Sequence, residues 1–172
     1  CYTKLSDDEK AEEYFTMALK DHSDSVETYI NLSDLYYRQR RLEEGANLLE
    51  TAVTLMPENI VLMHYLARIY IADVKYDLAF DILNRILELS PENIDAYWDL
   101  GNLSFETGDY ETAAAAFEHV LEKRDDNAIF FFRTGQAYEM CDNVDKALSN
   151  YLKAIAADRF MSQPYKKAAV MF

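Results

Sequence analysis

Residues 60–93 read IVLMHYLARIYIADVKYDLAFDILNRILELSPEN, and the order of large and small apolar residues in this stretch recurs along the whole chain, with the length of the stretch as its period. A small residue opens the second half of each copy, at Ala11, Gly45, Ala79, Ala113 and Ala147. A large apolar residue follows four positions later, at Phe15, Leu49, Leu83, Phe117 and Tyr151. A fixed period of this kind predicts one supersecondary unit that stacks on copies of itself.

Each period contains two helical patterns. The spacing of Tyr29, Leu32 and Tyr36 puts one apolar face on a first helix, and that of Gly45, Leu49 and Ala52 puts another on a second helix. Small residues in both helices are expected to let the backbones approach each other. Prolines such as Pro57 and Pro91 end the second helices, because proline has no N–H for the helix to use. Ser6 and Glu9 predict a capping box where the first helix of the chain starts.

The pattern resembles the tetratricopeptide repeat (TPR) family over nearly the whole chain. The family's signature places read Met63, Leu66, Ala67, Tyr70, Ala79, Leu83, Ile86 and Pro91 in residues 60–93. Departures include Ser104 where tyrosine is usual and Thr134 where leucine is usual. The resemblance implies an all-α fold, a right-handed α-solenoid of antiparallel helix pairs (the TPR superhelix), as a single domain over 1–172. Full repeats are expected at 26–59, 60–93, 94–127 and 128–161, with a second helix at 6–25 before them and a first helix at 162–172 after them.

Composition and charge argue against several classes of function. All four glycines occupy places in the repeat, so none is left for a phosphate-binding loop. The net charge of -14 argues against nucleic acid and anionic membranes, and favours a basic or apolar polypeptide partner. His22, His64 and His119 have no ligand spacing and no catalytic triad can be placed, so we expect no enzyme activity, no catalytic residue, no metal and no cofactor.

The two cysteines, Cys1 and Cys141, offer no disulfide framework. No stretch approaches the length of a membrane span, and no signal sequence opens the chain, which favours a cytoplasmic location. The alternative is a membrane-tethered lipoprotein, acylated at Cys1. A membrane is therefore expected as a partner only if Cys1 carries lipid.

Places within a repeat are numbered from its first residue, so that Ile60 is place 1 of residues 60–93. The TPR resemblance assigns places 2, 5, 6, 9, 12 and 13 of each repeat to the concave side. An aromatic and apolar stripe with polar neighbours results, and we expect it to bind a protein or peptide, because aromatic residues mark binding hot spots. The predicted groove residues are Ile30, Asp34, Tyr37, His64, Arg68, Ile71, Trp98, Asn102, Phe105, Phe132 and Gln136. Packing of the rings on neighbouring repeats is the alternative interpretation of the stripe.

Two further interpretations concern charge and subclass. Arg68 and Arg133 are expected to pair across the groove with the acidic residues between them, Asp95, Asp99 and Glu106. The carboxylate clamp of chaperone-binding TPR domains is missing, since Ile30, His64 and Trp98 stand at place 5. The asparagine ladder of O-GlcNAc transferase is missing too, because place 6 holds Tyr65, Asp99 and Arg133 after Asn31.

The sequence therefore predicts a non-catalytic interaction scaffold that holds a peptide or helix of a partner in its groove. The alternatives are a scaffold that self-assembles into a homo-oligomer through open solenoid ends, or the targeting arm of a larger enzyme. An uncovered apolar face would serve as the assembly end, formed by Tyr165, Ala168, Ala169 and Phe172.

Overall fold

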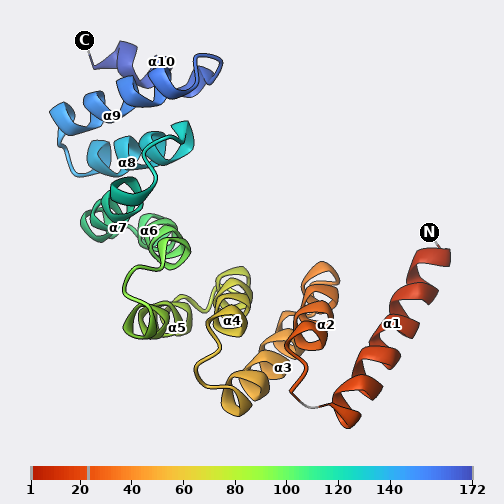
Figure 1. Ribbon diagram of the computed structural model, residues 1–172. Coiled ribbons are helices and arrows are strands. Elements are labelled where there is room, and N and C mark those ends of the chain that lie inside the picture. The colour runs from red at the N-terminus through yellow and green to blue at the C-terminus, as the bar shows by residue number, and fades with distance from the viewer. Residues whose placement is uncertain (1, 23, 172) are drawn as a thin grey trace. The chain divides into compact units, whose positions relative to one another are not determined.

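The computed structural model describes the backbone of residues 2–22 and 24–171, and the side chains of 7–22 and 24–171 (Figure 1). The chain divides into two compact units, residues 1–91 and 92–172. In the described part, unit 1 contains α1 (Tyr2–Asp21), α2 (Val26–Arg38), α3 (Leu42–Leu55), α4 (Ile60–Ala72) and α5 (Tyr76–Leu89). Unit 2 contains α6 (Ile94–Thr107), α7 (Tyr110–Lys123), α8 (Ala128–Met140), α9 (Val144–Ala157) and α10 (Ser162–Val170). The expected all-α architecture of paired helices is confirmed.

One prediction about the first helix is wrong. α1 begins at Tyr2, so Ser6 lies inside the helix and not at its N-cap. A serine inside a helix cannot accept from orphan N–H groups, because those groups belong to the first turn. Cys1 lies outside the described residues.

The first helix of each full repeat begins with a side-chain cap that recurs with the same period as the core. Ser25, Asn59, Asn93 and Asn127 accept hydrogen bonds from backbone N–H groups in the first turns of α2, α4, α6 and α8. These caps satisfy N–H groups that would otherwise lack partners, and each contributes about 1 kcal/mol. The repeat period therefore determines helix starts as well as helix faces.

The core of each unit is built from the predicted signature places. Leu49, Leu83 and Ile86 are fully buried in unit 1, as are Phe117 and Tyr151 in unit 2. The first, partial copy packs less completely, since Ala11, Phe15 and Ala18 are only half-buried.

The close approach at the small residues involves aromatic rings in addition to the expected backbone contact, since a Cβ added to Gly135 would also lie 3.3 Å from the backbone oxygen of Ala147. A Cβ added to Gly101 would lie 2.5 Å from the Phe117 ring, and one added to Gly135 would lie 2.7 Å from the Tyr151 ring. Each glycine therefore admits the large side chain that the following helix presents. Small residues on one helix and large residues on the next form complementary pairs within a repeat.

Candidate functional site

The predicted groove residues of unit 1 gather around the guanidinium of Arg68. Arg68 on α4 forms an ion pair with Asp34 on α2. Its guanidinium carbon lies 5.1 Å from the centre of the Tyr37 ring and 4.5 Å from that of Tyr65. A cation held between two aromatic faces and a carboxylate has little rotational freedom left, so its exposed N–H donors are already oriented for a ligand.

A cleft of about 430 Å³ opens beside Arg68. Asn31, Asp34, Tyr37 and Arg38 line it from α2, together with Phe15 from α1. The Arg38 Nε group donates to the backbone oxygen of Asp34 at 3.4 Å. Two guanidinium groups and one carboxylate thus line this cleft, which leaves it locally basic on a strongly acidic chain.

The remaining predicted residues of unit 1 form part of the same α2 and α4 surface. Ile30, His64 and Ile71 are half-buried. Their apolar carbon surface adjoins the polar cluster around Arg68 in sequence and helix register, as the repeat pattern predicts.

In unit 2, part of the predicted aromatic stripe packs against other side chains of the same unit. Trp98 on α6 is half-buried, with its ring centre 5.2 Å from Phe117 and 4.8 Å from Phe130. Phe105 packs edge-on against Tyr110 at 5.3 Å, and Arg133 lies 5.8 Å from the Phe105 ring centre. These rings hold α6 against α7 and α8, so intramolecular packing accounts for much of this aromatic surface.

The two polar residues of the predicted groove in unit 2 differ in their hydrogen bonds. Asn102 donates through Nδ2 to the backbone oxygen of Trp98 at 2.8 Å, within its own helix. The Oε1 atom of Gln136 is buried without a hydrogen-bond partner in the described structure. An unpaired buried carbonyl is costly, so a donor from water or a ligand would stabilise it.

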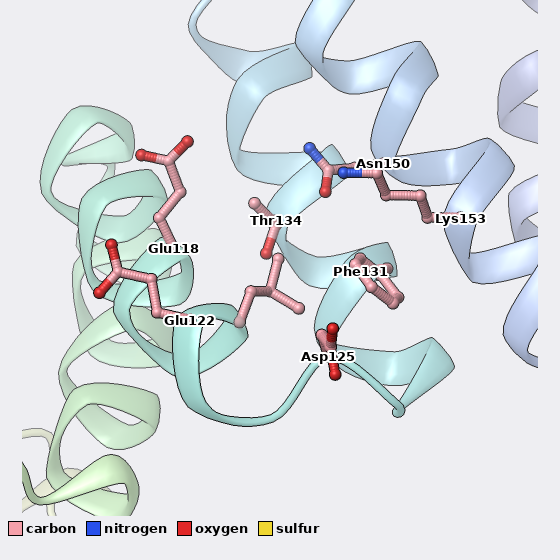
Figure 2. A pocket seen from close by; sticks show the side chains of 8 residues that line it. Glu118, Glu122, Asp125, Phe131, Thr134, Asn150 and Lys153 are labelled. Carbon is pink, nitrogen blue, oxygen red and sulfur yellow. The ribbon is translucent and has the colours of Figure 1, made fainter.

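A second cleft lies in unit 2 and was not predicted from the sequence. It has a volume of about 560 Å³ and lies between α7 and α9, with Phe131 and Thr134 of α8 between the two walls (Figure 2). Glu118 and Glu122 project from α7, and Lys153 projects from α9.

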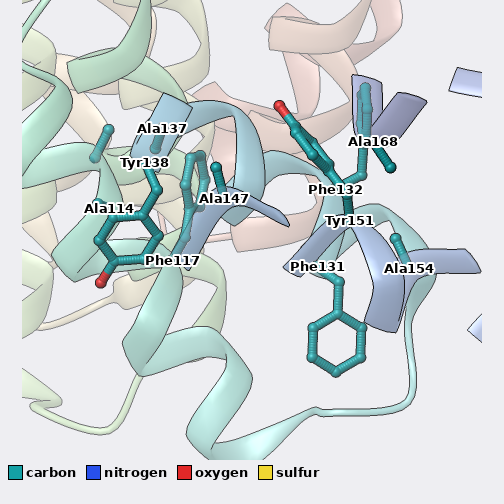
Figure 3. Packing of buried hydrophobic residues seen from close by; sticks show 11 residues of the cluster. Ala114, Phe117, Phe131, Phe132, Ala137, Tyr138, Ala147, Tyr151, Ala154 and Ala168 are labelled. Carbon is teal, nitrogen blue, oxygen red and sulfur yellow. The ribbon is translucent and has the colours of Figure 1, made fainter. Parts of the chain in front are cut away.

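Phe132 does not lie on an exposed groove surface. It is 7% exposed, and its ring centre lies 5.7 Å from that of Tyr151 (Figure 3). Place 5 of this repeat therefore contributes to the core, because α9 presents a large ring opposite it. The prediction that Phe132 contacts a partner is wrong for this conformation.

The expected pairing of Arg68 with the acidic residues that follow it stays a prediction, because those residues belong to unit 2. Arg68 pairs with Asp34, one repeat earlier at the same place 9. Equivalent places of successive first helices lie side by side within unit 1, which brings these two side chains together.

The predicted assembly end is only partly exposed. Tyr165 is 45% exposed and Ala169 is exposed, whereas Ala168 is 5% exposed and belongs to the core cluster of unit 2. The sequence pattern puts Ala168 on the uncovered face, but α9 covers it. Phe172 lies outside the described residues.

Several residues that line the cleft beside Arg68, or that contact Arg68 or Trp98, are absent from the predicted groove. Asn31 and Tyr65 stand at place 6 and Arg38 at place 13, and the resemblance assigns both places to the concave side. The signal for these three was therefore present. Phe15 and Phe130 carried none, since their contacts depend on how neighbouring helices pack.

The described part of the chain contains neither a metal site nor a membrane span. Within residues 7–22 and 24–171, no group of three or more His, Cys, Asp and Glu side chains is arranged to hold a metal ion. No helix of the described chain has the length and apolar character to cross a bilayer.

The chain spans between 22% and 41% of the length of the curated relatives it matches. It is 26% identical over 161 residues to the TPR repeat-containing protein YpiA of Bacillus subtilis, covering 86% of this chain and 38% of that protein. It is 23% identical over 160 residues to the lipopolysaccharide assembly protein B of Escherichia coli K12, covering 88% and 41%.

Solved structures share the fold. The crystal structure of MamA superposes with a TM-score of 0.80 at 22% identity, covering 94% of each chain. The structure of YrrB, described as a TPR protein with an unusual peptide-binding site, gives 0.78 at 21% identity and covers 93% of this chain and 82% of that one.

Family models agree with this likeness. Tetratricopeptide repeat models match residues 4–60, 39–100 and 72–131. Together with the recurring helix pairs, these matches show that the chain belongs to the tetratricopeptide repeat family.

Proposed function

We propose that this chain is a non-catalytic scaffold that binds a carboxylate-bearing peptide segment of a partner protein on the α2 and α4 face. The observation that carries the proposal is the fixed guanidinium of Arg68, held by Asp34 and two tyrosine rings beside a cleft. Arginine and tyrosine are enriched among residues that dominate binding energy. A planar guanidinium also matches a carboxylate, because two of its N–H groups can donate in parallel.

The local charge supports an acidic segment, although the net charge of the chain does not. Arg38 and Arg68 face the cleft with Asp34 as the only carboxylate among its lining residues. Binding depends on the groups a ligand touches, while the net charge acts at longer range and is screened by salt.

The test is a peptide selection with the full chain as bait. Random peptides displayed on phage are selected against the immobilised protein, and the affinities of the enriched peptides are then measured by fluorescence anisotropy. We expect enriched peptides to carry Asp, Glu or a free C-terminus. Replacing Arg68 by glutamine should weaken them about tenfold or more, since hot-spot truncations cost about 2 kcal/mol.

Arg159→Gln is the matched control, because Arg159 is an exposed arginine in unit 2. It removes the same charge without touching the cleft. If Arg68→Gln and Arg159→Gln leave the affinities equally unchanged, the α2 and α4 face is not the binding site.

Self-association is a second candidate, favoured by exposed apolar residues around α10. Phe160 is 97% exposed, Val170 87% and Tyr165 45%. Exposed apolar surface of this kind marks interfaces. Light scattering should then show mass rising with concentration for the wild type and not for a Phe160→Lys, Tyr165→Lys variant; a wild type that stays at 20.0 kDa excludes this candidate.

A further inference from the structure

The cleft between α7 and α9 shares no residue with the α2 and α4 face. Its floor is formed by α8, and its two walls come from the helices before and after α8 in sequence (Figure 2). Its volume of about 560 Å³ exceeds that of the cleft beside Arg68. It is wide enough for a long side chain of a partner.

One wall of the cleft carries carboxylates that form few interactions with other side chains of the protein. Glu118 is engaged, because it accepts from Tyr138 Oη and lies 3.3 Å from Lys146 Nζ. Glu122 is 66% exposed, and its ion-pair contact is a 3.6 Å approach to His119. Asp125 is exposed at the rim of the cleft. Glu122 and Asp125 are therefore available to a ligand.

The buried polar groups of the cleft present acceptors. Thr134 is fully buried, and its Oγ1 donates to the backbone oxygen of Phe130 at 2.8 Å, which leaves only lone pairs. Asn150 is 9% exposed, and its Nδ2 donates to the Lys146 oxygen at 2.9 Å. That bond directs the Asn150 Oδ1 towards Thr134 and the cleft, where no described residue donates to it (Figure 2). An amide oxygen that can still accept at the cleft is complemented by a ligand rich in N–H donors.

The protein's own lysine shows where a cation can sit. The Nζ atom of Lys153 lies 5.8 Å from the centre of the Phe131 ring, and in the described structure it forms no ion pair. An aromatic face attracts a cation through its quadrupole, and Phe131 thereby provides a second surface for positive charge.

We propose that this cleft binds an arginine side chain of a partner polypeptide. The guanidinium group forms ion pairs with Glu122 and Asp125 and donates to the Oδ1 of Asn150. The aliphatic part of the arginine side chain packs on the Phe131 ring. Arginine suits the cleft better than lysine, because its five N–H donors can serve carboxylates and a carbonyl at once. This basic-side-chain site is independent of the acidic segment proposed for unit 1.

The experiment uses the full ¹⁵N-labelled chain and a capped probe, acetyl-Gly-Arg-Gly-amide, followed by NMR. We expect saturable shifts of backbone amides in α7, α8 and α9. The same peptide with citrulline, which has the shape without the charge, should bind about tenfold more weakly. The peptide with glutamate should cause no shifts in these helices.

Variants test the assignment of roles. Glu122→Gln with Asp125→Asn should weaken the arginine peptide about tenfold, because two counter-charges are lost. Lys153→Met should strengthen it about threefold, because a repelling charge is removed. Glu58→Gln with Glu88→Gln changes the net charge equally on exposed residues of unit 1 and should leave binding unchanged.

Three results would overturn the proposal. They are wild-type affinity in the Glu122 and Asp125 double variant, equal weakening in the Glu58 and Glu88 control, and weaker binding after Lys153→Met. The last result would mean that Lys153 helps to hold the arginine peptide and does not repel it. None of these results depends on the α2 and α4 face.

Discussion

At the residue scale, the turn between the two helices of each full repeat uses one left-handed residue. Arg40, Val74, Gly108 and Asp142 have φ values of 61°, 60°, 87° and 56°. They are evenly spaced along the chain, so the turn geometry follows the same period as the core. Only Gly108 adopts this conformation without a Cβ penalty, and the β-branched Val74 is the least suited of the four.

Val74→Gly should stabilise the protein. The substitution relieves the left-handed strain of valine, worth about 1–2 kcal/mol, and gives back part of it through the greater freedom of glycine when unfolded. Little packing is lost, because Val74 is 67% exposed. We expect a net gain of about 1 kcal/mol in the free energy of unfolding, measured by urea denaturation.

The control for this substitution is Leu152→Gly. Leu152 lies in the interior of α9 and is 47% exposed, so its backbone is helical and its side chain is only partly packed. Glycine there should destabilise the chain by about 1 kcal/mol, because it is a poor helix former. A loss of stability in both variants would mean that Val74 is not strained.

At the element scale, successive helices are tied by hydrogen bonds between a first-helix tyrosine and a glutamate of the preceding helix. Tyr70 donates to Glu50 at 2.7 Å, and Tyr36 donates to Glu12 at 3.0 Å. Glu12 also accepts from Arg41 at 2.6 Å. The bonds to Glu12 connect α1 to α2 and to the start of α3, where the apolar packing is least complete.

The Glu12 cluster makes stability depend on pH. Hydrogen bonding from Arg41 lowers the pKa of Glu12 against the opposing effect of burial, and Tyr36 lowers it further. A carboxyl with a lowered folded-state pKa stabilises the protein above its unfolded pKa, and that stability is lost as the pH falls through the folded pKa. Glu12→Gln should therefore cost about 1 kcal/mol at pH 7 and less at pH 3, as measured by urea denaturation at both pH values. An equal cost at the two pH values would contradict this role.

The aromatic contacts of α6 give a second prediction at this scale. Trp98→Ala should destabilise the chain by about 2–3 kcal/mol, because the ring contacts both Phe117 and Phe130. Trp98→Phe should recover more than half of this loss. The measurement is the urea midpoint at constant m-value. A Trp98→Ala protein as stable as the wild type would mean that Trp98 does not contribute to packing, and it would favour a role for this residue in binding.

At the scale of the whole molecule, the chain has 31 acidic and 17 basic residues, which gives the net charge of -14. Self-repulsion of this size opposes the compact state. Exposed ion pairs recover little of it, because each contributes only about 0–1 kcal/mol.

Raising the NaCl concentration should therefore increase the melting temperature. Screening shortens the range of the repulsion from about 10 Å at 0.1 M to about 3 Å at 1 M salt. Differential scanning calorimetry over this range measures the effect, and NaCl is preferred to sulfate because sulfate also strengthens apolar burial. A melting temperature that falls with NaCl would show that ion pairs outweigh the repulsion.

The repeat period by itself determined that the large residues at the signature places are buried and that the helices come in pairs. Burial at Leu83, Phe117 and Tyr151 could be predicted, because each repeat meets the same neighbours and apolar side chains must leave water. The caps at Asn59 and Asn93 follow the same period and could have been found from the same pattern.

Only the tertiary structure decided which of the predicted groove residues are exposed. Phe132 and Trp98 occupy the same place in successive repeats, yet one is buried and the other half-buried, because different side chains of the next helices lie against them. The packing of α2 on α4 brings Arg68 to Asp34, a pair that the repeat pattern alone did not predict. Repeat position determines a residue's helix face, whereas contacts between side chains on different helices determine its exposure and its partners.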